Sequence, residues 1–309
     1  MTEPPLRLGT RGSALALVQA KAVAKQLGGA EIVPIKTADG DVGDKARFVK
    51  AIERALLDGE IDLAVHSAKD LPSDLPEGLE IAGVTAREDA RDAYVGSVDA
   101  RARESATRDV LGEVPEGSRI GTSSLRRRAQ ILALRPDLEV IDVRGNVDTR
   151  LAKLEAGDYD GLVLAAAGLR RLGQAEQISF CLELDELVPS PGQGALAIEA
   201  PHAQDRPVTA AESITDRGTL GTLTAERALV GAVDASCNTP LGGHATLEQG
   251  GRMRLRVFCG LPDGSEWIRD ELEMDASEPE ALGTALAERI KSAGAEDILA
   301  RAEKMAVAS

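Results

Sequence analysis

Short apolar runs alternate with amphipathic stretches along the first part of the chain. Apolar runs flanked by Gly, Pro or charged residues predict strands, and apolar positions spaced three and four apart predict helices. Gly28 directly follows one amphipathic stretch and is a typical helix stop. The predicted strands are residues 6–10, 31–37, 61–67 and 79–85, and the predicted helices are 13–27 and 46–60. Strands that alternate with helices predict an α/β sheet with crossover helices.

The same pattern restarts after a further strand at 91–97. Predicted strands lie at 118–124, 138–145 and within 159–173, and predicted helices lie at 125–135 and 147–157, the first of them ended by Pro136. Residues 99–118 are charged and poor in large apolar side chains, which favours a surface insertion. The apolar run at 192–200 has no partner near it in the sequence, so we expect this strand to return to the first sheet.

The pattern changes again near residue 215. A helix is predicted at 222–233, strands at 253–260 and 265–274, and helical sequence at 278–300, which together describe a small α+β unit. The predicted fold class is therefore α/β, with two α/β domains and a small C-terminal α+β domain. The expected divisions are 1–90 with 192–214 for the first domain, 91–191 for the second and 215–309 for the third.

Composition narrows the function. The 309 residues are 43% hydrophobic but only 2% aromatic, so the cores must be built from aliphatic side chains. A formal net charge of −15 argues against a nucleic-acid partner, which would favour a basic face. No run approaches the roughly 18 apolar residues of a membrane span, and the N-terminal residues lack the apolar core of a signal peptide. Three cysteines make no disulfide framework, so we expect a cytoplasmic protein.

Against this acidic background, seven arginines gather in three short segments. They are Arg126, Arg127, Arg128, Arg144, Arg150, Arg170 and Arg171. One interpretation is that they form surface ion pairs on helices. The other is that they bind a small anion, since a guanidinium pairs with a carboxylate through two hydrogen bonds.

The predicted positions of these segments favour the second interpretation. Several of them follow strands, and ligands of open α/β sheets bind at the carboxyl ends of strands. Asp70 stands at such a strand end beside Lys69, either as a loop ion pair or as a proton shuttle and cation stabiliser. His66 is expected to pack in the core, whereas His202 and His244 are expected in loops without metal-ligand spacing, so no metal site is predicted.

One cysteine differs in context from the other two. Cys237 stands among small polar residues, in "VDASCNTPLGG", whereas Cys181 and Cys259 lie in apolar runs. It is either a tolerated surface thiol or a functional one, because reactivity depends on local environment.

The segments "HSAKDLP", "GTSSLRRRAQ", "RGNVDTR", "YDGLVLAAAGLRRL", "PGQGALAIE" and "TAERALVGAVDASCNTPLG" occur in this order along the chain. Each is weak evidence alone, but the ordered set resembles the porphobilinogen deaminases, also called hydroxymethylbilane synthases. The resemblance runs from "LRLGTRGSALAL" to the C-terminal end. It implies three domains, the first two built like periplasmic binding proteins, and a monomeric enzyme.

The resemblance also implies a mechanism. Four porphobilinogen molecules lose ammonia and are joined in turn to a dipyrromethane cofactor held covalently by a cysteine of the third domain, which matches Cys237. Water then releases the linear tetrapyrrole. Asp70 matches the catalytic acid, which stabilises positive charge on pyrrole nitrogens. Each ring carries an acetate and a propionate, so many cationic groups are needed.

The remaining roles follow from the same match. Residues implied to hold the cofactor are Lys69, Ser124, Arg126, Arg127 and Arg150. Residues implied to face the substrate porphobilinogen are Arg11, Ser13, Arg144 and Arg171. In one place the chain departs from the family pattern: the segment at 37–51, where the family has a lid, is shorter than usual.

Two other functions compete with this one. A non-catalytic binding module for a small polycarboxylate would use the same two lobes, but it would need no cysteine in a third domain. An enzyme acting on a phosphate ester would use the helix start at "GTSS", but the chain lacks a glycine-rich phosphate loop or an acidic metal-binding pair.

Overall fold

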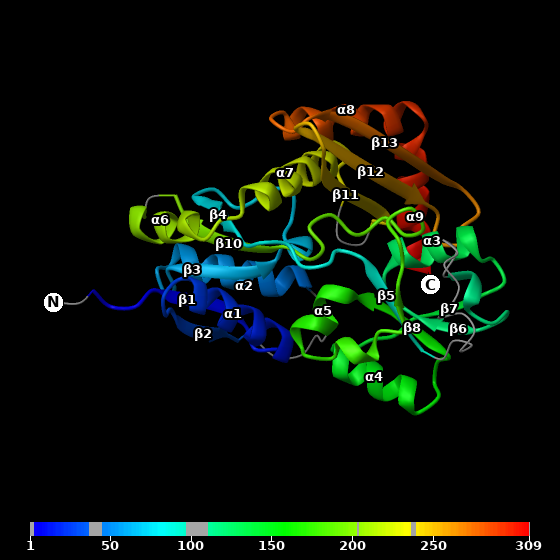
Figure 1. Cartoon of the computed structure of the whole chain (residues 1–309), viewed down its shortest axis with the longest axis horizontal. Coiled ribbons are helices and arrows are strands. Elements are labelled where there is room, and N and C mark those ends of the chain that lie inside the picture. The colour runs from blue at the N-terminus through cyan, green and yellow to red at the C-terminus, as the bar shows by residue number, and fades with distance from the viewer. Residues whose placement is uncertain (1–2, 37–44, 97–110, 203, 236–238, 309) are drawn as a thin grey trace.

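The protein was studied as a computed structural model, which describes residues 3–36, 45–96, 111–202, 204–235 and 239–308. Within these ranges it contains three β-sheets, each with its own helices (Figure 1). The first sheet lies at the left of Figure 1, the second at the lower right and the third at the upper right. No helix in the described part of the chain has both the length and the apolar character needed to cross a membrane.

The first sheet has the strand order β2-β1-β3-β10-β4. Its strands are β1 (Arg7–Arg11), β2 (Glu31–Ile35), β3 (Leu63–Ser67), β4 (Leu79–Val84) and β10 (Leu196–Pro201). Strands β1, β2 and β3 are parallel, whereas β10 runs antiparallel to both of its neighbours, β3 and β4. The expectation that residues 192–200 return to the first sheet is therefore confirmed.

Helices cover both faces of this sheet, as its continuous apolar strands require. They are α1 (Ala14–Gln26), α2 (Lys45–Leu57) and α6 (Asp205–Ser213). Leu63 and Val65 of β3 pack in a core with residues of α1 and α6, whereas Ala64 packs in a core with residues of α2. This alternation follows from the two-residue period of a strand.

The second sheet has the order β7-β6-β8-β5-β9. Its strands are β5 (Asp92–Gly96), β6 (Arg119–Gly121), β7 (Glu139–Ile141), β8 (Gly161–Ala165) and β9 (Phe180–Cys181), and its helices are α3 (Leu125–Leu134), α4 (Val147–Glu155) and α5 (Ala166–Arg171). Short 3-10 turns lie at η3 (Leu111–Glu113) and η4 (Ala175–Gln177). Strands β6, β7 and β8 are parallel, and β5 is antiparallel to β8 and β9. The two α/β sheets thus share one plan, with an antiparallel strand second from one edge.

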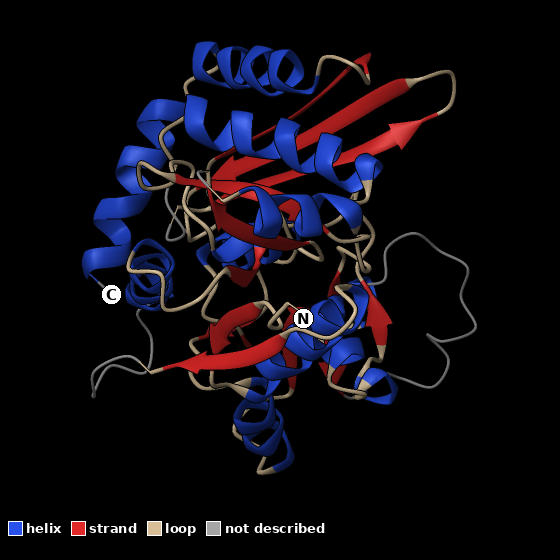
Figure 2. Ribbon diagram, turned by 90° about the vertical axis from the view of Figure 1, so that its left-hand side faces the viewer, coloured by secondary structure: helices blue, strands red, loops and turns tan. Residues whose placement is uncertain are grey.

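The third sheet is a three-stranded antiparallel meander. Its strands are β11 (Leu241–Glu248), β12 (Arg252–Gly260) and β13 (Trp267–Asp275), and its helices are α7 (Arg217–Ala232), α8 (Pro279–Ser292) and α9 (Ala295–Ala308). Figure 2 shows these long strands with helices packed along them. Alternate apolar residues of β12, such as Met253 and Leu255, enter a core with α7 and α8. The predicted fold class, two α/β units and one small α+β unit, is confirmed.

The structure contains elements that the sequence analysis did not predict. Strands β9 and β11 and helix α6 were not predicted, and the helical sequence at 278–300 is divided into α8 and α9 at Gly294, whose φ is 101°. His244 lies buried on β11 rather than in a loop. Most of the predicted insertion at 99–118 and most of the short segment at 37–51 lie outside the described residues, as does Cys237.

Candidate active site

The turn after β3 carries Lys69 and Asp70. It is the 3-10 turn η1 (Ala68–Asp70), and both side chains are partly buried. The backbone N–H of Ala68 donates to the carbonyl of Ala195 over 3.0 Å, which fixes the turn against the segment that enters β10. The ammonium of Lys69 donates to Oε1 of Gln193 over 3.0 Å. Two segments far apart in the sequence thus meet where the acid and the lysine are predicted.

Gly192 allows this close approach. Its φ is +74°, and a Cβ there would lie 2.7 Å from the carbonyl carbon of Ala68 and 2.7 Å from the nitrogen of Lys69. Real side chains do not tolerate such contacts with backbone atoms, and a positive φ also favours glycine. The glycine therefore lets the β10 segment lie directly against the turn.

A buried carboxylate holds the arginine pair of α3. Nη1 of Arg126 donates to Oδ2 of Asp92 over 2.7 Å, and Nε of Arg127 donates to Oδ1 of Asp92 over 2.9 Å. Asp92 is fully buried, and the two arginines are 4% and 6% exposed. Burial opposes the ionisation of Asp92, but the adjacent guanidinium groups outweigh burial and hold the pKa of this carboxyl well below its usual range.

Both arginines also donate to backbone carbonyls. Nη1 of Arg126 reaches the carbonyl of Val188 over 2.7 Å, and Nη1 of Arg127 reaches the carbonyl of Val163 over 3.0 Å. Burial lowers the pKa of Arg127, but arginine remains charged because its ordinary pKa is above 12. Two buried positive charges therefore face one negative charge, which leaves a surplus of one.

A second group of donors surrounds the start of α3. Ser124 is the N-cap of this helix, and its hydroxyl oxygen accepts from the backbone N–H of Arg127 over 3.4 Å. Nε of Arg150, from α4, donates to the carbonyl of Gly145 over 2.9 Å, and its Nη2 lies 3.5 Å from Oγ of Ser123. Burial lowers the pKa of Arg150, and the positive charge of Arg127 lowers it further. The structure thus brings Ser124, Arg127 and Arg150 together at the start of α3.

Arg11 and Ser13 lie where β1 leads into α1. The guanidinium of Arg11 stacks over the ring of Phe48 in α2, 4.3 Å from its centroid. Ser13 is the N-cap of α1, and its hydroxyl oxygen accepts from the backbone N–H of Ala16 over 3.4 Å. Both residues are partly buried.

The last two predicted residues differ from each other. Nη2 of Arg171, at the end of α5, donates to the carbonyl of Gly194 over 2.6 Å, and burial lowers its pKa. Arg171 is therefore tied to the same segment as Lys69. Arg144 is exposed, and it takes part in packing through its carbonyl, which accepts from Nζ of Lys153 over 3.4 Å.

A second buried carboxylate, Glu226 of α7, meets the β10 segment from the side of the third sheet. Arg87 donates to both of its oxygens, over 2.7 and 2.9 Å, and the backbone N–H of Gly192 donates to Oε2 over 2.7 Å. Nδ1 of His244 lies 3.2 Å from Oε1. Burial opposes the ionisation of Glu226, but Arg87 and His244 hold its pKa at about 2.

Sequence reasoning missed Asp92, Gln193 and Glu226. Gln193 and Glu226 lie inside the quoted segments "PGQGALAIE" and "TAERALVGAVDASCNTPLG", so a closer inspection of buried polar residues in these segments could have found them. Asp92 lies outside all of the quoted segments, and only its position at the start of a buried strand distinguishes it.

The described residues on both sides of Cys237 contact this region. In α7, Nη2 of Arg227 donates to the carbonyl of Ser73, three residues after Asp70, over 2.6 Å. In β11, the N–H of Gly243 donates to the carbonyl of Pro189 over 2.9 Å. The helix before the cysteine and the strand after it are therefore fixed to the two segments that meet at Lys69.

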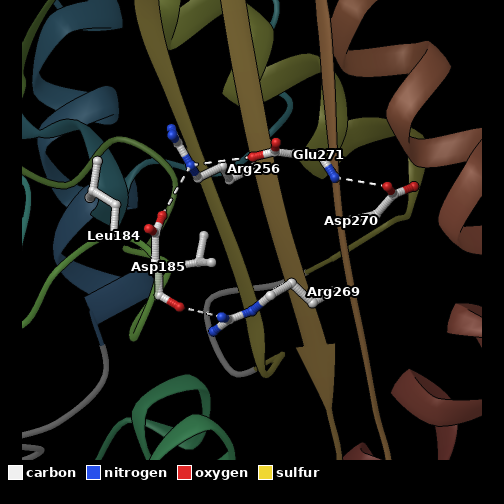
Figure 3. Close-up of a pocket in the computed structure, with 7 residues that line it drawn as sticks. Leu184, Asp185, Arg256, Arg269, Asp270 and Glu271 are labelled. Carbon is white, nitrogen blue, oxygen red and sulfur yellow. Dashed lines mark hydrogen bonds and ion pairs between the residues drawn. The ribbon is translucent and has the colours of Figure 1, made fainter. Parts of the chain in front are cut away.

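A cavity of about 370 Å³ lies elsewhere, between residues 184–188 and strands β12 and β13 (Figure 3). In it, Arg269 donates to the carbonyl of Asp185, and Arg256 lies 3.5 Å from Glu271. Three carboxylates line it against two arginines, Asp270 being the third, so it offers no surplus positive charge. It therefore does not suit a polycarboxylate ligand.

Comparison with known proteins identifies the family of the chain. Residues 6–209 match the family model described as "Porphobilinogen deaminase, dipyromethane cofactor binding domain", and residues 220–292 match "Porphobilinogen deaminase, C-terminal domain". The chain belongs to the porphobilinogen deaminase family. The predictions of this family and of a dipyrromethane cofactor are confirmed.

Relatives agree over almost the whole length. A porphobilinogen deaminase of Thermus thermophilus is 46% identical over 304 residues, covering 95% of this chain and 98% of the relative. One of Syntrophotalea carbinolica is 43% identical over 315 residues, covering 97% and 96%. The activity of the family is that of a hydroxymethylbilane synthase, a transferase of porphyrin and heme biosynthesis that condenses four porphobilinogen molecules. The comparisons do not support the alternative, a non-catalytic binding module.

Solved structures give more distant matches. The BvgS VFT2 domain of Bordetella pertussis is 15% identical and covers 69% of this chain and 87% of that chain, with a TM-score of 0.40. A putative periplasmic sulfonate-binding protein of Methylobacillus flagellatus is 12% identical and covers 72% and 67%, with a TM-score of 0.38. Likenesses this distant say nothing about function.

Proposed function

We propose that Cys237 carries the dipyrromethane through a thioether and that Asp70 is the catalytic acid of the hydroxymethylbilane synthase reaction. The observation that carries the proposal is a pair of contacts made by the described elements on either side of Cys237 in the sequence, from Arg227 of α7 to Ser73 and from Gly243 of β11 to Pro189. They fix α7 and β11, the described elements that precede and follow Cys237 in the sequence, to the segments around the turn that holds Asp70.

The donor set fits a ligand with several carboxylates. Among the described residues, Nε of Arg11 and Nε of Arg126 are buried without a hydrogen-bond partner. An unpaired buried donor is costly, and a carboxylate oxygen would satisfy it. We therefore assign Lys69, Ser124, Arg126, Arg127 and Arg150 to the carboxylates of the cofactor.

The substrate side takes the remaining donors. Arg11, Ser13, Arg144 and Arg171 are assigned to the acetate and propionate of porphobilinogen. Because the hydroxyl oxygen of Ser13 already accepts from α1, its O–H remains available as a donor. The same holds for Ser124 at α3.

Asp70 has the one role that needs a negative charge. When bound, the dipyrromethane supplies the pyrrole carbon to which the substrate is joined. Loss of ammonia from porphobilinogen leaves a cation, and a carboxylate held in place beside the substrate nitrogen stabilises it. The fixed turn at Ala68 orients Asp70 for this task.

The proposal also covers the domain boundaries, the oligomeric state and the compartment of the protein. The division into 1–90 with 192–214, 91–191 and 215–309 is supported by the strands of each sheet, which fall within one of these parts. We also propose a monomer that acts in the cytoplasm. Free thiols at Cys181 and Cys259 support a reducing compartment.

Intact mass under denaturing conditions tests the cofactor assignment. Active protein is expected to exceed its sequence mass by one dipyrromethane, and Cys237→Ser is expected to lack this increment. Cys181→Ser is the matched control and should keep it. An active preparation with the bare sequence mass would refute the assignment.

Measurements of turnover test the assignment of Asp70 as the catalytic acid. Asp70→Asn is nearly isosteric, so it should fold and should lose at least about a hundredfold in kcat. Asp74→Asn, an exposed carboxylate four residues later, should keep wild-type turnover. Near-normal turnover of Asp70→Asn would assign the acid–base chemistry to another group.

A further inference from the structure

Gln193 joins the lysine of the first sheet to the arginines of the second. It is 1% exposed, in the segment that enters β10. Its Oε1 accepts from Nζ of Lys69 over 3.0 Å, and its Nε2 donates to Oδ1 of Asp92 over 2.9 Å and to the carbonyl of Ala90 over 2.7 Å. Asp92 in turn holds the arginine pair of α3. One amide therefore completes a continuous path between the two groups of cations.

The chemistry of both neighbours fixes the amide in one orientation. An ammonium can only donate, so the amide oxygen must face Lys69. An ionised carboxylate can only accept, so the amide nitrogen must face Asp92. The backbone is fixed as well, because the N–H of Gln193 donates to Ser190 over 2.9 Å and its carbonyl accepts from Nε of Arg87 over 2.9 Å.

The amide also keeps the charge of the site. Lys69, Arg126 and Arg127 contribute three positive charges and Asp92 contributes one negative charge, so the path carries a net charge of +2. A glutamate of the same size would reduce this surplus to +1 and would place two carboxylates in contact. Both changes weaken a site for a polycarboxylate.

We propose that Gln193 is a positioning residue. It holds the Lys69 ammonium at a fixed spacing from the arginine pair and, being neutral, leaves their combined positive charge for the carboxylates of the cofactor and substrate. This inference rests on the proposed roles of Lys69, Arg126 and Arg127.

The variant Gln193→Glu tests the inference through the pH dependence of kcat/KM, which a purely structural role of Gln193 would not change. Protonated glutamic acid has one donor and one acceptor, as the amide path requires, whereas glutamate has only acceptors. The variant should therefore approach wild type as the pH falls. Charged groups from several elements surround this segment. Lys69 and Asp70 come from η1, Asp92 from β5, Arg126 and Arg127 from α3, Arg171 from α5, Glu226 from α7 and Arg87 from the connection before β5.

The experiment measures kcat/KM for porphobilinogen from pH 6 to pH 8.5 with full-length holoenzyme, each value divided by that of wild type at the same pH. Gln193→Glu is expected to lose at least about tenfold at pH 8.5, since a buried polar pair is left unmatched. It should recover most of this loss at pH 6. Gln193→Met is the neutral control, with a loss of about tenfold that does not change with pH.

Equal and pH-independent losses in the two variants would overturn the proposal, and so would wild-type values in either. If Gln193→Glu does not fold, Gln193→Met still decides, because wild-type kcat/KM with all three side-chain hydrogen bonds removed would refute the positioning role. Failure of the proposed function would be recognised separately, because wild type assayed alongside would then lack the mass increment on Cys237.

Discussion

The buried carboxylate Asp92 offers a quantitative test of how the site is built. Replacing it with asparagine keeps the shape but removes the charge and one of the two acceptor oxygens. The arginines at 2.7 and 2.9 Å would then be two buried cations without a counter-charge. Removing one partner of a buried ion pair costs about 3–5 kcal/mol. Since whole domains are stable by only about 5–15 kcal/mol, Asp92→Asn should be close to the limit of folding.

The matched control is Asp160→Asn. Asp160 also pairs with an arginine, Arg119, over 3.0 Å, but its side chain is 46% exposed. Exposed pairs contribute about 1 kcal/mol or less, so this variant should be near wild type. The assay is urea unfolding followed by far-ultraviolet circular dichroism for all three proteins.

The pH dependence of this difference follows from its sign. The folded pKa of Asp92 is held below the unfolded value, so its stabilisation is complete above the ordinary aspartate pKa and is lost only in stronger acid. The gap between wild type and Asp92→Asn should therefore be the same at pH 5 and pH 7. A gap within about 1 kcal/mol of that of Asp160→Asn would refute the view that Asp92 neutralises the arginine pair.

Two further predictions concern the segment before β10. Gly192→Ala should lower turnover at least about tenfold, because its methyl group would displace the backbone at Lys69. The control is Gly28→Ala, where φ is a similar 79° but nothing lies within 4 Å, and it should lose only about 1 kcal/mol of stability and no activity. Equal activities of the two variants would contradict this reasoning. Glu226, held at a pKa of about 2, should contribute about 3 kcal/mol that is present above pH 4.5 and lost as the pH falls toward 2. Urea unfolding between pH 2 and pH 5 should therefore be less pH-dependent for Glu226→Gln than for wild type, and an unchanged pH dependence would reject Glu226 as the titrating group.

The sequence predicted elements whose signals are local. Strand β3 follows from an apolar run that ends in polar residues, and helix α3 follows from a helical stretch that Pro136 ends. Strand β9 has only two residues, and α6 begins at a residue without a side-chain cap, so neither has a strong local signature.

The environment of the arginines could not be predicted in the same way. Sequence reasoning weighed surface ion pairs against anion binding for Arg126 and Arg127, yet in the structure both pair internally with Asp92, 34 and 35 positions away. A contact of this kind depends on how α3 packs against β5. The hydrophobic periodicity of the sequence does not predict this contact, because tertiary packing determines the pairing.

The two buried carboxylates differ in charge balance, and this difference separates their roles. Glu226 faces one arginine, Arg87, so the pair is neutral before His244 is counted. Asp92 faces two arginines and leaves one positive charge over. A neutral pair has little to offer an anion, and the backbone bond from Gly192 to Glu226 indicates that it fastens the β10 segment to the third sheet. One positive charge beside Asp92 is not neutralised, although the chain as a whole has a net charge of −15. A buried surplus of this sign is unfavourable unless an anion comes to it, which is why we assign polycarboxylate binding to Asp92's arginines rather than to the Glu226 cluster.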